Sequence, residues 1–70
     1  MTTEVYLRVH QEAQDLDLKI DALAAFIYYD ASFEDLDEAQ RYLLRTQLRA
    51  MKAYYAILDE RLNCSSLRYA

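Results

Sequence analysis

The chain contains neither glycine nor proline in its 70 residues. These two residues form most tight turns and strand ends, so their absence argues against a fold of several short strands. A single cysteine, Cys64, excludes an internal disulfide framework and suits a reducing compartment, while leaving open a disulfide between two chains. No stretch of 18 uncharged apolar residues is present, which excludes a transmembrane helix. The first residues do not resemble a secretory signal, so we expect a cytoplasmic protein.

What remains is a chain with 54% hydrophobic residues, too many for a disordered acidic segment. Its length allows one domain at most, so residues 1–70 are expected to form a single unit. Long helices with one short connection are the architecture that this composition favours.

Apolar residues recur at alternating spacings of four and three, which predicts a helix from about residue 4 to residue 28. Thr2 or Thr3 can supply its N-cap oxygen. This seam comprises Val9, Ala13, Leu16, Ile20, Leu23 and Ile27.

A second helix is expected over about residues 38–62, after a corner at residues 29–37. Asp35 with Glu38, or Asp37 with Gln40, fits a capping box at its start. Phe33 and Leu36 are expected to fold back over the corner. Polar residues 63–66 predict the helix end, with a tail at residues 63–70. The core seam comprises Leu44, Leu48, Met51, Tyr55, Leu58 and Leu62.

A connection this short makes the two helices antiparallel neighbours, so the predicted fold is an all-α two-helix hairpin. The second helix carries another seam, one residue earlier, which leaves its apolar arc too wide for one partner. A lone hairpin also buries little surface for its length, so we expect self-association, most simply into a four-helix bundle. The expected interface, called the second seam below, comprises Leu43, Gln47, Ala50, Tyr54, Ile57 and Arg61.

Charge is divided unevenly along the chain. Residues 1–38 carry ten acidic and two basic residues, whereas residues 39–58 carry four basic residues and no acid. The four recur at spacings of 4, 4 and 3, so they form one line on a helix. This basic stripe comprises Arg41, Arg45, Arg49 and Lys52.

The stripe has two interpretations. Antiparallel packing brings acids of the first helix close, which predicts exposed pairs worth about 0–1 kcal/mol each that set the helix register. Arg41 lies beyond those acids and is where an anion site would begin. The predicted pairs are Asp21 with Arg45, Asp17 with Arg49, and Asp15 with Lys52.

Alternatively, the stripe binds an anionic ligand, because arginines on a rigid helix offer forked donors to phosphate and tyrosines can stack on bases. A net charge of −4 argues against duplex DNA as the partner. The expected ligand residues are Arg41, Tyr42, Arg45, Arg49, Lys52 and Tyr54.

Catalysis and metal binding are not supported by the sequence. His10 is the only histidine and lacks a nucleophile or a second ligand at helical spacing. No glycine-rich loop is available to cradle a phosphate. We therefore expect a protein that is not an enzyme and needs no cofactor or metal.

Polar residues in or beside the seams point to specificity rather than stability. A buried network of Glu12 with Arg61, or of Lys19 with Gln47, is predicted as the specificity device. Tyr28, Tyr29 and Tyr42, the tip tyrosines, cluster at the hairpin tip and are a candidate contact for a partner protein.

The spaced residues together resemble a family of small helical-hairpin accessory proteins of tailed bacteriophages and prophages. The resemblance covers roughly residues 5–62. In the first helix the matching residues are Arg8, Val9, Glu12, Leu16, Lys19, Ile20, Leu23, Phe26 and Ile27. In the corner and the second helix they are Phe33, Leu36, Leu43, Leu44, Gln47, Ala50, Met51, Tyr54, Ile57, Leu58 and Arg61.

This resemblance implies a cytoplasmic accessory factor of an infected bacterial host, with two alternative roles. One is a counter-defence sponge, an oligomer that sequesters a nucleotide second messenger. The other is a modulator that blocks a host protein through the tip tyrosines or an acidic face comprising Glu12, Asp15, Asp17 and Asp21.

Overall fold

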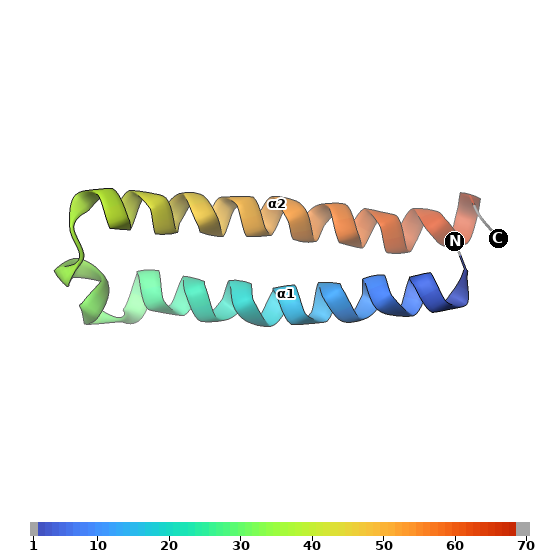
Figure 1. Cartoon of the computed structure of the whole chain (residues 1–70), viewed down its shortest axis with the longest axis horizontal. Coiled ribbons are helices and arrows are strands. Elements are labelled where there is room, and N and C mark those ends of the chain that lie inside the picture. The colour runs from blue at the N-terminus through green and yellow to red at the C-terminus, as the bar shows by residue number, and fades with distance from the viewer. Residues whose placement is uncertain (1, 69–70) are drawn as a thin grey trace.

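The computed structural model describes the backbone of residues 2–68 and the side chains of residues 2–63. Two long antiparallel helices, α1 (Thr3–Tyr29) and α2 (Glu38–Arg68), lie side by side, joined by a short 3₁₀ helix, η1 (Ala31–Asp35) (Figure 1). The molecule is a rod of 50 × 15 × 14 Å. The prediction of an all-helical hairpin is confirmed, and within residues 2–68 there is no strand.

The core runs along the line between the helices and follows the predicted seams. Each helix contributes one apolar residue per turn or so, because residues three and four apart share a face. Leu58 is fully buried, and Met51, Tyr55 and Leu62 pack against the same cluster. The buried residues are Val9, Ala13, Leu16, Ile20, Ile27, Phe33, Leu48 and Leu58.

The helix starts are defined by side-chain caps. Thr2 caps α1, its hydroxyl Oγ1 accepting from the Val5 amide at 3.2 Å. Of the two possible caps for α2, Asp37 is the one used, since its carboxylate accepts from the Gln40 amide at 2.8 Å. No positive φ angle is needed for these turns among the described residues, which fits a chain without glycine.

The hairpin tip is closed by Phe33, as predicted. The Asp30 carboxylate accepts from the Ser32 amide at 2.8 Å, which starts η1 and turns the chain across the tip. Phe33 is then only 1% exposed and meets Phe26 edge to face, with ring centroids 5.8 Å apart. Leu36 is partly buried against the same cluster.

The second helix continues to Arg68, which corrects the end predicted at residue 62. Asn63 and the serines that follow are only moderate helix formers, but each costs no more than about 0.7 kcal/mol relative to alanine. Without glycine or proline these residues do not stop the helix. The disulfide between two chains that the sequence leaves open involves the side chain of Cys64, which lies outside the described side chains.

Candidate functional site

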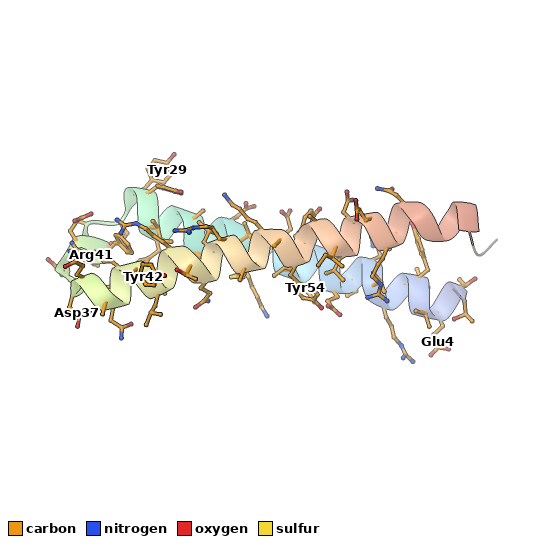
Figure 2. The ribbon with its side chains drawn as sticks, turned by 90° about the horizontal axis from the view of Figure 1, so that it is seen from above. Glu4, Tyr29, Asp37, Arg41, Tyr42 and Tyr54 are labelled. Atoms are coloured by element: carbon orange, nitrogen blue, oxygen red, sulfur yellow. The ribbon has the colours of Figure 1, made fainter. Side chains whose placement is uncertain are left out.

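The basic stripe lies on an exposed flank of α2, beside the buried seam. The structure places its four side chains in three different environments, although they are evenly spaced in the sequence. Figure 2 shows Arg41 and Tyr42 near the tip end of the rod and Tyr54 about midway along it.

Arg41 lies beyond the acids of α1, as predicted, but it forms an ion pair with an acid of η1 that the sequence analysis did not consider. Its guanidinium Nη1 donates to Oε2 of Glu34 at 3.1 Å, and its side chain is only 27% exposed. The partner was missed because it comes from η1, which folds back at the tip, and not from α1. This ion pair links the start of α2 to η1.

Arg45 is held by an aromatic ring. Its guanidinium carbon lies 5.1 Å from the centroid of Phe33, a cation–π geometry. The pairing expected with Asp21 is not formed within the described part of the chain.

Arg49 and Lys52 are exposed and make no ion pair with any described residue. The pairs predicted with Asp17 and Asp15 are therefore absent. Asp15 instead accepts from Gln11 Nε2 at 3.0 Å. Two helix positions correspond to about 200° of rotation, so Asp15 and Asp17 cannot both face the stripe.

The two tyrosines assigned to the stripe are separated by the fold. Tyr42 is 61% exposed and adjoins the stripe in sequence. Tyr54 lies on the opposite flank of the buried seam, where it contacts a groove lined by α1. The structure thus separates Tyr54 from the flank of α2 that carries the basic stripe.

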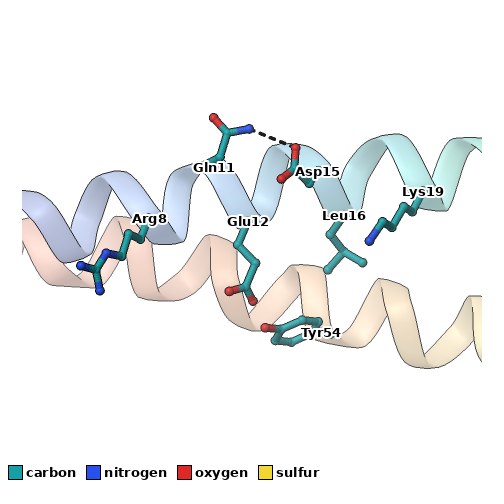
Figure 3. A pocket seen from close by; sticks show the side chains of 7 residues that line it. All are labelled: Arg8, Gln11, Glu12, Asp15, Leu16, Lys19 and Tyr54. Carbon is teal, nitrogen blue, oxygen red and sulfur yellow. Dashed lines mark hydrogen bonds between the residues drawn. The ribbon is translucent and has the colours of Figure 1, made fainter.

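That groove, called the Tyr54 groove below, is open to solvent and has a volume of about 410 Å³. Figure 3 shows Arg8, Glu12 and Lys19 projecting from α1 on the side where Tyr54 lies. The lining residues are Arg8, Gln11, Glu12, Asp15, Leu16, Lys19 and Tyr54.

Only some of the charged side chains that line the Tyr54 groove form ion pairs or hydrogen bonds within the hairpin. Arg8 pairs with Glu4 one turn away, and Asp15 is engaged by Gln11. Among the described residues, Glu12 and Lys19 make neither an ion pair nor a side-chain hydrogen bond. This site was not predicted from the sequence, although spacings of four and seven place Arg8, Glu12 and Lys19 on one flank of α1.

The second seam is largely uncovered. Leu43, Tyr54 and Ile57 are 55%, 45% and 56% exposed. The networks suggested for Glu12 with Arg61 and for Lys19 with Gln47 are not formed within the described residues. Gln47 instead approaches the Met51 sulfur, with Nε2 and Sδ 3.8 Å apart.

The tip tyrosines are all exposed, Tyr29 most of all at 88%. The acids expected to form one face are spread around α1, because Glu12 and Asp15 line the Tyr54 groove while Asp17 lies elsewhere. Among the described residues, no helix combines the length and apolar character needed to cross a membrane.

The fold and its surfaces define a small all-helical hairpin protein with an open groove beside Tyr54 and an exposed apolar seam. The chain belongs to the Sequestin family, whose model matches residues 3–64. The family name is consistent with a sequestering role. No curated protein and no solved structure matches the chain significantly.

Proposed function

We propose that the protein is a non-enzymatic, phage-type accessory factor that sequesters a nucleotide second messenger. The proposal depends on one observation: several cationic side chains on this rigid hairpin have no acidic partner. Arg49 and Lys52 on α2 and Lys19 on α1 have no acid within ion-pair distance among the described residues. Membership of the Sequestin family supports a role in binding and withholding a ligand. A phage counter-defence role, acting in the cytoplasm of an infected bacterium, follows from the resemblance noted in the sequence.

Self-association is part of this proposal. A second copy packed on the second seam covers Leu43, Tyr54 and Ile57, which are about half exposed in a single hairpin. Apolar surface contributes roughly 25 cal/mol per Å² on burial, so this face favours a bundle of at least four helices.

Binding and recovery of the ligand test the proposal. Cyclic mononucleotides, cyclic dinucleotides and linear nucleoside phosphates are titrated by calorimetry and by thermal unfolding at constant ionic strength. At a hundredfold excess over Kd, binding adds about 2.7 kcal/mol of stability, so Tm rises by about 11–22 °C. The bound nucleotide is then recovered chemically unchanged after heat denaturation. Inorganic phosphate at the same ionic strength is the control for general screening.

Two results contradict the proposal. If no nucleotide raises Tm above the phosphate control, the protein does not sequester this class of ligand. A nucleotide that is recovered cleaved or modified shows that the protein is an enzyme.

The alternative function is modulation of a host protein, and one observation favours it over other binding roles. Tyr28, Tyr29 and Tyr42 are 66%, 88% and 61% exposed around the tip. Exposed aromatic side chains are enriched in protein interfaces. If the protein binds no nucleotide, contact of the tip tyrosines with a host protein becomes the favoured function.

A further inference from the structure

The hairpin tip carries the whole net charge of the protein. Residues 28–42 hold five of the twelve acids and one of the eight basic residues, so their charge of −4 equals that of the complete chain. Seven acids and seven basic residues remain outside this segment and cancel. Among the described residues, only one of the tip acids, Glu34, has a basic partner, Arg41. The exposed acids of the tip are Asp30, Glu34, Asp35, Asp37 and Glu38.

An exposed ring and a carboxylate share an open hollow at this tip. Tyr29, the last residue of α1, is 88% exposed, and Asp30 follows it directly. Figure 2 shows Tyr29 projecting outward near the tip end of the rod. Both residues line the hollow, together with Ala25, Phe26 and Ala31. This site, called the Tyr29 hollow below, therefore offers an aromatic face and a negative charge from adjacent residues.

The Asp30 carboxylate is held in place, and one of its oxygens is available. Its Oδ1 accepts from the Ser32 amide at 2.8 Å, whereas Oδ2 makes no hydrogen bond or ion pair with any described residue. The adjoining turn is fixed by the buried Phe33 ring, which packs on Phe26. A group that is already ordered loses little conformational entropy when it binds. Oδ2 is therefore a preorganised acceptor for a cationic donor.

We infer that the hairpin tip docks on the basic surface of a partner protein, and that an arginine of that partner occupies the Tyr29 hollow. The guanidinium stacks on the Tyr29 ring and donates to Oδ2 of Asp30, because arginine combines cation–π contacts with hydrogen bonds to carboxylates. The other tip acids attract the surrounding positive charge. The inference rests on the alternative function, modulation of a host protein, and specifies its partner; it does not depend on nucleotide binding.

The charge of the tip disfavours other occupants. Nucleic acids and anionic lipids carry phosphates, which the tip acids repel. A second copy presents an equally acidic tip, so a symmetric contact between two tips brings like charges together. An apolar partner desolvates the acids without pairing them. A protein surface with arginines complements both the exposed ring and the charge, and arginine and tyrosine are enriched in protein interfaces.

Fluorescent peptides with arginine, lysine or glutamine at alternate positions of one alanine host sequence serve as probes. Their binding to the full-length protein is measured by fluorescence anisotropy at constant ionic strength. Tyr29→Leu and Asp30→Asn alter the hollow, and asparagine keeps an oxygen that can accept from the Ser32 amide. Tyr6→Leu is the control for the ring, at the opposite end of α1. Asp37→Asn is the control for the charge, because it also retains a capping oxygen but lies outside the hollow.

We expect the arginine peptide to bind about tenfold more tightly than the lysine peptide, since lysine lacks the planar fork that stacks and pairs at once. The glutamine peptide should not bind. Tyr29→Leu and Asp30→Asn each weaken binding of the arginine peptide about fivefold, while their controls change Kd less than twofold. Tyr29→Leu also lowers the preference for arginine over lysine, a change that a purely structural defect would not produce.

The inference is overturned if the arginine peptide does not bind, if it binds no better than the lysine peptide, or if the hollow variants behave like their controls. Free arginine amide that binds as tightly as the peptide would identify a small-molecule site instead. A change in the mass of the native assembly on Tyr29→Leu, measured by light scattering, would make the tip a contact between copies. Nucleotide titration of the same variants tests sequestration separately, so either proposal can fail while the other stands.

Discussion

At the residue scale, Phe33 organises the hairpin tip. Its ring is 1% exposed, meets Phe26 edge to face, and lies under the guanidinium of Arg45. One aromatic side chain from η1 therefore links α1 to the first turns of α2. The neighbouring Arg41–Glu34 ion pair fastens the same region from the outside.

Replacing Phe33 tests how much the tip contributes to stability. Phe33→Ala leaves a cavity where both helices meet, and we expect a loss of about 3–5 kcal/mol in the free energy of unfolding. Urea denaturation followed by circular dichroism, at a fixed protein concentration, measures it. Tyr29→Ala is the control, since Tyr29 is at the same tip but 88% exposed, and its effect should stay within about 0.5 kcal/mol. Equal losses for the two variants would contradict a core role for Phe33.

At the element scale, the sequence offers two equivalent capping boxes for the start of α2, and the structure uses only one of them. Asp35 and Asp37 each precede a residue that completes a capping box. Asp37 alone accepts from a backbone amide of α2, because Asp35 is the last residue of η1.

The use of Asp37 as the cap predicts which of the two aspartates contributes to stability. Asp37→Ala should cost about 1 kcal/mol, because the Gln40 amide loses its acceptor. Asp35→Ala removes the same charge two residues earlier and should change stability much less. Thermal unfolding of both variants at one concentration provides the comparison. If Asp35→Ala is the more damaging change, the helix starts earlier than the structure places it.

The two long helices and their buried seams were predictable, because apolar spacing reports which side of a helix faces a neighbour. The buried residues Ile20 and Leu48 both lie on predicted seams. The end of α2 was not predictable from polar residues alone, since the signal that stops a helix is usually glycine or proline. Charge partners were missed for another reason. Long side chains such as Arg41 choose among several acids, and the nearest one came from a corner whose fold the pattern does not specify.

The Tyr54 groove was only partly predictable. Glu12 and Lys19 stood out as polar residues bordering a seam, but Tyr54 was predicted to be a ligand residue beside the basic stripe and a member of the second seam. Which flank of α2 adjoins which flank of α1 depends on the path of the chain through η1. That path depends on Asp30 and Phe33 rather than on helical periodicity.

At the scale of the whole molecule, the hairpin is a thin rod whose core is a single line of side chains. Its dimensions are 50 × 15 × 14 Å, so the rod is only two helices wide. The second seam leaves Leu43, Tyr54 and Ile57 about half exposed on α2. We have proposed it as the contact with a second copy.

Disrupting the second seam should separate the copies. Ile57→Glu places a charge in the proposed interface, so we expect a monomer of lower stability at micromolar concentration. Light scattering coupled to size-exclusion chromatography measures the mass. Leu18→Glu is the control, because Leu18 is 69% exposed on α1 and lies outside the proposed interface. A native protein that is already monomeric would contradict the prediction.

The position of the chain ends has a mechanical consequence. The start of α1 and the end of α2 lie at the same end of the rod, and Phe33 closes the other (Figure 1). Tension applied to the two ends peels one helix from the other turn by turn, instead of shearing all the core contacts at once. Resistance to force is therefore low at the open end, and the contacts around Phe33 are the last to separate.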